Sequence, residues 1–215
     1  MSVKHLQLAW IGVVACWLFF VLEITTDFWF GSKFPGYNWM EQSISYLGQK
    51  GSPVLHMVRT WGVIFSLLLI LFAAGFQLVF NGQKWTGVAT ALLVIYALAE
   101  GIGSAFFSID PPGTIVMSSD AYLHNLFSSI GDISLGLFPF LLMIIIRNST
   151  GNFYLYLWST IGIGVLMAVF FGIAKYHQPD NFILYYKGVW QRILLLNYHM
   201  MLVIVSIMML QRLIK

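Results

Sequence analysis

The sequence has few charged residues and almost no cysteine. Only 9% of its 215 residues are Asp, Glu, Lys or Arg, whereas 59% are hydrophobic and 17% are aromatic. So little charge excludes an ordinary soluble domain, which needs a polar surface. Cys16 is the sole cysteine, which excludes an intrachain disulfide and any metal site built from several cysteines. The net charge of +3 is too small for nucleic-acid binding, so we expect no nucleic-acid partner.

Familiar catalytic motifs are also missing. The chain has no Gly-x-Ser-x-Gly elbow, no phosphate-binding loop, no His-x-x-x-His pair and no His-Glu-x-x-His. The first apolar segment, "LAWIGVVACWLFFVL", is not followed by a small-residue cleavage site. We therefore expect this segment to be a retained helix and not a signal peptide.

Long apolar segments are what the sequence does have. A span across a hydrocarbon core of about 30 Å needs about 20 apolar residues. Six such segments occur, at 6–30, 54–80, 86–107, 121–146, 153–175 and 188–213. They predict an all-α polytopic membrane bundle of six transmembrane helices, because backbone in lipid must satisfy its own hydrogen bonds. Residues 1–215 are expected to form a single transmembrane domain in contact with membrane lipids.

The orientation in the membrane is less clearly encoded. An even number of spans places both termini on one side, and that side has five basic and no acidic residues: Lys4, Lys84, Arg147, Arg212 and Lys215. The positive-inside rule then favours a cell-membrane protein with cytoplasmic N and C termini. The other six basic residues lie toward the opposite side, so a simple count does not decide the orientation.

Polar side chains recur inside the predicted spans. Ionisable groups within spans are costly and usually mark a functional cavity or path. The groups fall toward the ends of the spans opposite the termini: Glu23, Thr26, Asp27, His56, Arg59, Tyr96, Glu100, Ser104, Ser108, His124, Ser128, Asp132, Arg192 and His199. We expect them to form a water-accessible cavity open to that side. The alternative is that the arginines form buried pairs with the carboxylates and that the polar groups merely hold the helices together.

The residue types in this set suggest acid–base chemistry. Histidine and carboxylate side chains can exchange protons with a substrate, and the candidate catalytic residues are His124, Asp110, Asp132, Glu100 and His199. The candidate substrate-binding residues are Ser43, Ser45, Arg59, Arg192 and Glu23. A zinc site formed by His56, His124 and His199 is a further alternative, since imidazole is a common zinc ligand. Their spacing favours neither the metal nor a metal-free acid–base pair.

The longest polar stretch, "EQSISYLGQKGSP" at 41–53, follows the first span. Asn38 and Glu41 have the spacing of a capping box, which predicts the start of a short helix. Its apolar positions predict that this helix lies in the membrane interface. We expect it to cover the cavity with Ser43 or Ser45 turned inward.

Three passages together resemble one family: "SISYLGQKGSP", "FFSIDPPG" followed by "LHNLFSSIGD", and "GVWQRILLLNYH". They are similar to the domain of unknown function 998 family of uncharacterised prokaryotic integral membrane proteins. The resemblance covers nearly the whole chain and implies no established reaction. It implies that seven positions deserve testing: Ser43, Ser45, Gly48, Asp110, His124, Gly188 and Arg192.

A more distant likeness is to the superfamily of alkaline ceramidases and adiponectin-receptor-like membrane hydrolases. That likeness would imply a serine, an aspartate and three histidines around zinc. The chain departs from this pattern, because Val203 stands where a second histidine would follow His199.

The sequence predicts a membrane-embedded enzyme, hydrolase-like, that acts on a lipid or lipid-linked substrate. Two alternatives stay open at this point. One is a non-enzymatic protein that binds or transports a lipid or small ligand, and the other is an assembly partner of another membrane protein.

Overall fold

The computed structural model describes residues 2–146, 151–176 and 182–214, and within them every regular element is helical. The long helices are α1 (Val3–Lys33), α2 (Leu55–Val79), α3 (Thr86–Tyr96), α4 (Ser119–Ile145), α5 (Gly151–Tyr176) and α7 (Lys187–Ile214). Helix α3 continues directly into a π-helix, η2 (Ala97–Ser104). Two short elements complete the fold: a 3₁₀ helix, η1 (Ile44–Gly48), and α6 (Phe182–Tyr185).

The predicted membrane spans are confirmed. Among the described residues, six helical segments are long and apolar enough to cross a membrane, α3 and η2 together forming one of them. The chain is therefore a multi-pass membrane protein. The first helix runs from Val3 to Lys33, so it is longer than the predicted apolar segment 6–30.

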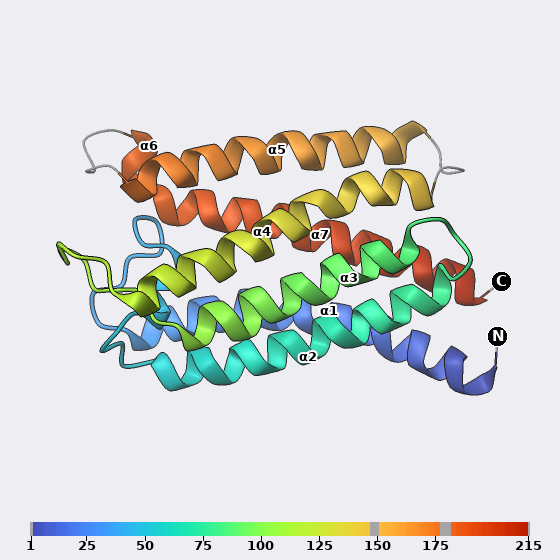
Figure 1. Cartoon of the computed structure of the whole chain (residues 1–215), viewed down its shortest axis with the longest axis horizontal. Helices are drawn as coiled ribbons and strands as arrows, with labels where there is room; N and C mark the ends of the chain where they lie inside the picture. The colour runs from blue at the N-terminus through green and yellow to red at the C-terminus, as the bar shows by residue number, and fades with distance from the viewer. Residues whose placement is uncertain (1, 147–150, 177–181, 215) are drawn as a thin grey trace.

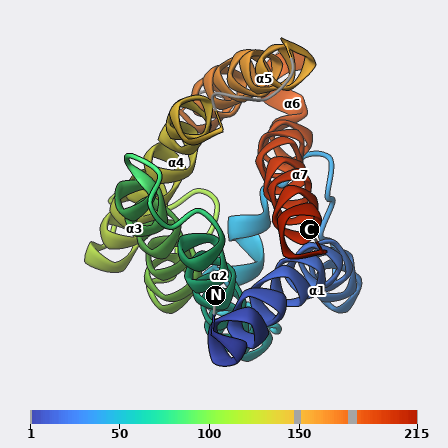
Figure 2. The same ribbon diagram turned by 90° about the vertical axis from the view of Figure 1, so that its right-hand side faces the viewer.

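The long helices run side by side, with both termini at one end of the bundle (Figure 1). We call the opposite end, where residues 34–54, residues 105–118 and α6 lie, the distal end. Seen end-on, the helices form a ring in the order α1, α2, α3, α4, α5 and α7, and α7 returns beside α1 (Figure 2). The light-blue segment that contains η1 lies inside this ring (Figure 2).

The half of the bundle nearest the termini has an apolar core. Phe76 is fully buried there and packs against Phe138, with ring centroids 5.5 Å apart. Helices α1 and α2 cross where Gly12 meets Gly75, and a Cβ added to Gly12 would lie 2.9 Å from the Gly75 Cα. Since lipid offers no hydrophobic drive between helices, such close van der Waals contacts hold this half together.

A second close approach joins α2 to the π-helix η2. A Cβ on Gly62 would overlap the Gly101 carbonyl oxygen. The Ser66 hydroxyl donates a hydrogen bond of 2.7 Å to the Ala97 carbonyl oxygen. Wider π-helical turns are often found at functional sites, and this one carries Glu100.

Candidate functional site

A cavity of about 120 Å³, lined by apolar side chains and several acidic ones, lies within the distal half of the bundle, and we call it the chamber. Four acidic residues line it, contributed by α1, η2 and α4: Glu23, Asp27, Glu100 and Asp132. His124 and Ser45 also line it. Among the described residues of its wall there is no lysine or arginine. The predicted convergence of polar groups on one cavity is therefore present in part, and the charged side chains of the described wall are acidic.

The chamber adjoins a larger cavity of about 330 Å³ at the distal end, the vestibule. Ser43, Asp110, Ser128 and Lys187 line the vestibule. His124 and Ser45 line both cavities, so these two residues stand at the boundary between them.

A third cavity, of about 230 Å³, opens between α1 and α7, and we call it the lateral groove. Its apolar rim includes Ile24, Phe28 and Leu196, which are 38%, 51% and 45% exposed. Exposed apolar side chains on membrane-spanning helices face lipid. Glu23 and Asp27 line both the groove and the chamber, so the chamber has one neighbour at the distal end and one on the lipid-facing side.

His124 is held in one orientation by the end of the third span. It is 5% exposed, and its Nδ1 lies 2.8 Å from the Ser104 carbonyl oxygen and 2.9 Å from that of Phe107. Carbonyl oxygens only accept hydrogen bonds, so Nδ1 carries the proton. In the neutral ring Nε2 is consequently the basic nitrogen. The contact also satisfies carbonyl groups that the end of a helix leaves without partners.

Two of the chamber carboxylates are positioned by hydrogen bonds from neighbouring helices. The Trp61 indole N–H donates to Glu23 Oε2 at 2.8 Å. The Ser128 hydroxyl donates to Glu100 Oε1 at 2.7 Å. Ser128 lies one helical turn after His124 on α4, so both residues lie on one face of the helix.

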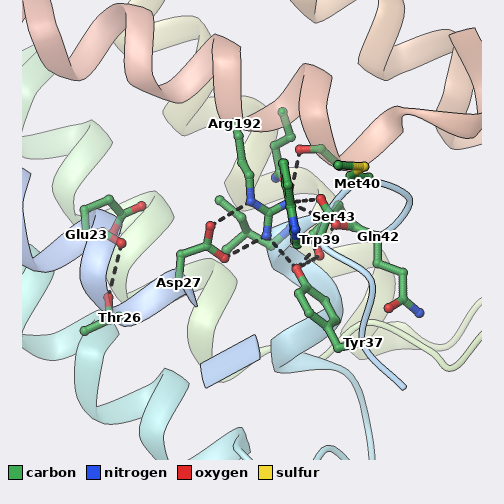
Figure 3. A network of polar contacts seen from close by, with 12 residues as sticks. Glu23, Thr26, Asp27, Tyr37, Trp39, Met40, Gln42, Ser43 and Arg192 are labelled. Atoms are coloured by element: carbon green, nitrogen blue, oxygen red, sulfur yellow. Dashed lines mark hydrogen bonds and ion pairs between the residues drawn. The ribbon is translucent and has the colours of Figure 1, made fainter. Parts of the chain in front are cut away.

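Arg192 on α7 binds residues 34–54, which we call the first distal loop, and also binds Asp27 on α1 (Figure 3). We call this set of bonds the Arg192 latch. The Nε and Nη2 of Arg192 donate to the two carboxylate oxygens of Asp27 at 2.7 and 2.8 Å. Nη2 also donates to the Tyr37 hydroxyl at 2.7 Å, and Nη1 donates to the carbonyl oxygens of Trp39 and Gln42 at 2.7 and 3.1 Å. The guanidinium is thus occupied by protein groups, and Arg192 lies outside the chamber wall. Its predicted role in substrate binding stays a prediction.

Gly188 makes the latch sterically feasible. A Cβ at this position would overlap the carbonyl oxygens of Trp39 and Gln42. Without one, the Gly188 amide donates to the Met40 carbonyl oxygen at 3.0 Å. The four-residue spacing of Gly188 and Arg192 therefore has a physical reason. The glycine lets the loop approach α7, and the arginine one turn later binds the carbonyl groups of that loop.

The short helix of the first distal loop differs in detail from the sequence prediction. The Asn38 amide is bound by Gln42 Oε1 at 2.8 Å, and the helix begins later, as the 3₁₀ turn from Ile44 to Gly48. Gln191 Oε1 accepts the Ile44 amide proton at 2.6 Å, which ties this turn to α7 inside the ring. The expectation of an inward-facing serine is confirmed by Ser45.

The three histidines proposed as zinc ligands do not come together. His199 Nε2 lies 2.6 Å from the Tyr96 hydroxyl, and its ring meets that of Phe19 edge-on. His56 is exposed at the start of α2. Within the described part of the chain no three His, Cys, Asp or Glu side chains are grouped to hold a metal ion. The ligand set His56, His124 and His199 is therefore wrong, because His199 is enclosed by apolar and aromatic neighbours.

Two further candidates lie away from the chamber wall. Arg59 donates to the Phe106 carbonyl oxygen at 3.3 Å and stacks against the Phe106 ring. Asp110 accepts the Ser118 amide proton at 2.7 Å and pairs with Lys50 at 3.3 Å. The Ser118 backbone and hydroxyl, followed by Lys50, lower the pKa of Asp110. Asp110 still lines the vestibule, but its contacts join two distal loops.

The candidate catalytic and substrate-binding residues do not include Asp27, Trp61 or Tyr37. Opposite charges toward the distal ends of the first and last spans were the available signal for the Asp27–Arg192 pair. Burial raises the pKa of Tyr37 to about 12, so the phenol keeps its proton and donates to the Ser43 carbonyl oxygen at 3.1 Å. Nothing in the sequence spacing indicates that contact.

Comparison with known proteins gives one match. No curated protein and no solved structure matches the chain, and the likeness to alkaline ceramidases stays a prediction. A family model described as "Protein of unknown function (DUF998)" matches residues 10–208. This range contains all three passages on which the resemblance rested. The chain therefore belongs to the DUF998 family of proteins of unknown function.

Proposed function

We propose that this protein is a membrane-embedded, hydrolase-like enzyme that acts on the polar group of a lipid. The observation that carries the proposal is the position of the chamber. It shares His124 and Ser45 with the vestibule and shares Glu23 and Asp27 with the lipid-facing groove. Water entering by the vestibule and a lipid entering by the groove would meet at the chamber.

The fixed tautomer of His124 supports a role as general base. A basic Nε2 takes a proton from water while the water oxygen attacks an acyl carbon of the lipid. The resulting imidazolium returns that proton to the leaving oxygen or nitrogen as the acyl bond breaks. One water is consumed, and the products are an acid and an alcohol or amine. Glu100 and Asp132 line the same chamber and would stabilise the imidazolium.

The test is lipid turnover by the purified protein. Wild type, His124→Gln and the control Lys84→Gln, an exposed position at the end near the termini, are incubated with a total membrane lipid extract. Mass spectrometry then measures which lipids disappear and which products form. We expect turnover by wild type and Lys84→Gln and at least a roughly hundredfold loss in His124→Gln, the scale of general-base catalysis. An unchanged extract with wild type would refute the enzymatic proposal.

The same geometry favours a second function, the binding or passage of a lipid's polar group without chemistry. The chamber adjoins cavities on two sides, as a passage requires. In that case a lipid would co-purify with the protein and be released unaltered from both wild type and His124→Gln.

The vestibule is proposed to face the outside of the cell, with both termini in the cytoplasm. The loops 105–118 and 80–85 lie at opposite ends of the bundle (Figure 1), and they contain the exposed residues Ile115 and Lys84. Each is replaced by cysteine in a Cys16→Ala background, and intact cells are treated with a membrane-impermeant thiol reagent. Labelling of Ile115→Cys alone supports this orientation, and labelling of Lys84→Cys alone reverses it.

A further inference from the structure

We infer that the acyl lipid proposed as the substrate carries a phosphate in its headgroup, and that Lys187 and the hydroxyls of Ser43 and Ser45 bind this phosphate in the vestibule. The inference rests on the proposed function and adds the class of headgroup. Its basis is a lysine that has no carboxylate partner within the described part of the chain and that shares one cavity wall with two hydroxyl groups.

Lys187 supplies the positive charge. It is partly buried, is the first residue of α7 and lines the vestibule. Its Nζ donates to the Tyr46 hydroxyl at 3.3 Å and lies 4.7 Å from the centre of the Tyr46 ring. No carboxylate among the described residues forms an ion pair with it. An ammonium group has three donors, so two are left for a ligand, and lysine is a common phosphate-binding residue.

Asp110 does not neutralise Lys187. It is the one acidic residue among the described residues of the vestibule wall. It accepts the Ser118 amide proton at 2.7 Å and pairs with Lys50 at 3.3 Å. Lys50 also lies 3.7 Å from Asp120, whose side chain is 52% exposed and therefore screened by water. The charge of Asp110 is thus met by Lys50, and the charge of Lys187 is left for an anion.

Two serine hydroxyls supply further donors. Ser43 and Ser45 line the vestibule on either side of Ile44, where η1 begins. The Ser43 side chain makes no capping hydrogen bond to this helix. Within the described residues neither hydroxyl is hydrogen-bonded. A phosphate needs several donors around its charged oxygens, and a basic pocket between membrane helices that also offers hydroxyl groups suits it.

The rest of the lipid has an apolar path. Phe65 and Leu194 line the chamber, and Ile24 and Leu196 line the lateral groove beside it. Arg192 also lines the groove, but its guanidinium is occupied by the Arg192 latch. An acyl chain that passes through the chamber into the groove therefore meets mainly apolar side chains.

This placement brings the acyl bond to His124. The phosphate lies in the vestibule with Lys187 and not in the chamber, where the charged residues of the described wall are acidic. His124 and Ser45 line both cavities, so the bond between headgroup and chain would lie beside them. Attack by water breaks the acyl C–O bond. One water is consumed, and the products are a fatty acid and a phosphate-bearing alcohol.

Three matched probes test the inference: 1-O-dodecylglycerol 3-phosphate, 1-O-dodecylglycerol and glycerol 3-phosphate. The first two are ethers, which the proposed hydrolysis does not consume. Binding to the purified full-length protein in a neutral maltoside detergent is measured by native mass spectrometry. We expect the phosphate ether to bind at least about tenfold more tightly than the neutral ether, on the scale of one charge-assisted hydrogen bond. Glycerol 3-phosphate, which lacks the chain, should bind far more weakly than the phosphate ether.

Variants assign the preference to Lys187. Lys187→Gln should weaken binding of the phosphate ether about tenfold and leave the neutral ether unchanged, whereas Lys187→Arg should keep the preference. Ser43→Ala combined with Ser45→Ala should weaken the phosphate ether about threefold, on the scale of neutral hydrogen bonds. Lys33→Gln removes an exposed lysine at the distal end of α1 and is the matched control, which should bind as wild type does. Melting temperatures without ligand verify that each variant is folded.

Equal affinity of wild type for the two ethers would overturn the inference, and so would a preference that survives in Lys187→Gln. Glycerol 3-phosphate binding as tight as that of the phosphate ether would assign the site to a free phosphate and overturn the lipid. These outcomes are distinguishable from failure of the proposed enzyme. His124-dependent turnover of acyl lipids without a preference for phosphate refutes the headgroup class alone, whereas selective binding of the phosphate ether without turnover of its ester counterpart refutes the enzymatic step alone.

Discussion

The two halves of the bundle are held together in different ways. Near the termini, α1 and α2 touch directly at Gly12 and Gly75, and aromatic side chains such as Phe76 fill the core. In the distal half the ring of helices surrounds cavities and the turn η1. There the helices are joined by polar bonds, including those of Arg192 to Asp27 and of Trp61 to Glu23.

This difference assigns stability mainly to the half near the termini and the candidate functional site to the distal half. Apolar packing needs only matching shapes. The half near the termini has some polar bonds, such as that from Trp17 Nε1 to Ser206 Oγ at 2.8 Å, but none of the described buried residues of that half is a carboxylate. A half that contains carboxylates inside a membrane must orient each of them with a partner, because unpaired buried polar groups are costly. We therefore expect a large loss of stability only from substitutions that break a distal polar bond joining a helix to a loop or to another helix.

The largest effect is expected from the Arg192 latch. Arg192→Ala leaves the buried Asp27 carboxylate without its cation and releases the loop carbonyls of Trp39 and Gln42. Loss of one member of a buried ion pair typically costs about 3–5 kcal/mol. The measurement is the unfolding free energy in detergent by denaturant titration. Arg59→Ala, which removes one hydrogen bond to a carbonyl, is the control and should cost much less; equal losses would contradict the latch.

A smaller effect is expected where α2 meets η2. Gly62→Ala places a Cβ against the Gly101 carbonyl oxygen and Ala105 Cβ, and overpacking of this kind costs about 1–3 kcal/mol. Gly172→Ala is the matched control, because nothing lies within 4 Å of its added Cβ. The melting temperature should fall in Gly62→Ala and stay unchanged or rise slightly in Gly172→Ala. A similar fall in both variants would mean that helix contact at Gly62 is unimportant.

The Tyr96–His199 pair tests the boundary between the two halves. Tyr96→Phe removes the hydroxyl that lies 2.6 Å from His199 Nε2, and a buried nitrogen without a partner costs about 1–3 kcal/mol. The double variant Tyr96→Phe/His199→Leu removes both polar groups and should recover much of that loss. Unfolding titrations of the wild type, both single variants and the double variant measure the coupling. If the two single effects simply add, the residues do not act as a pair.

The sequence predicted the helices well and the roles of the polar residues less well. Apolar length alone locates the spans, because the membrane thickness dictates it. The sequence also placed His124 and Ser128 in one set of polar residues expected to form a cavity. It could not distinguish His124, which lines the chamber, from His199, which binds Tyr96, since that difference depends on neighbours far apart in the chain.

The first distal loop shows a second limit of structure prediction from the sequence. Capping patterns describe local bonds, and the Asn38–Glu41 spacing indicated a helix start that the structure has at Ile44 instead. The competing bonds are partly local, from the Asn38 amide to Gln42, and partly distant, from Gln191 and Arg192 about 150 residues later in the chain. Long-range contacts of this kind override a local signal without leaving a trace in the local sequence.

The smallest effect is expected from Asp110, which joins the loops at the mouth of the vestibule. Its pKa is lowered from the ordinary value of 3.8, chiefly by the Ser118 amide. A lowered pKa means that the charged carboxylate stabilises the fold: its contribution is complete above pH 3.8 and is lost as the pH falls through the lowered pKa. Asp110→Asn should reproduce that loss at neutral pH by weakening the bonds to Ser118 and Lys50.

Hydrogen exchange of the Ser118 amide, relative to its intrinsic rate, measures this contribution. Protection should be high at pH 7 in wild type, lower in Asp110→Asn, and lower in wild type below pH 3.8. Lys50→Met should have a weaker effect, because its partly exposed ion pair is screened by water. The unfolding free energy should barely change in either variant, since the apolar half is untouched. A fall as large as that of Arg192→Ala would show that the vestibule loops support the whole bundle, and the division between the two halves would then fail.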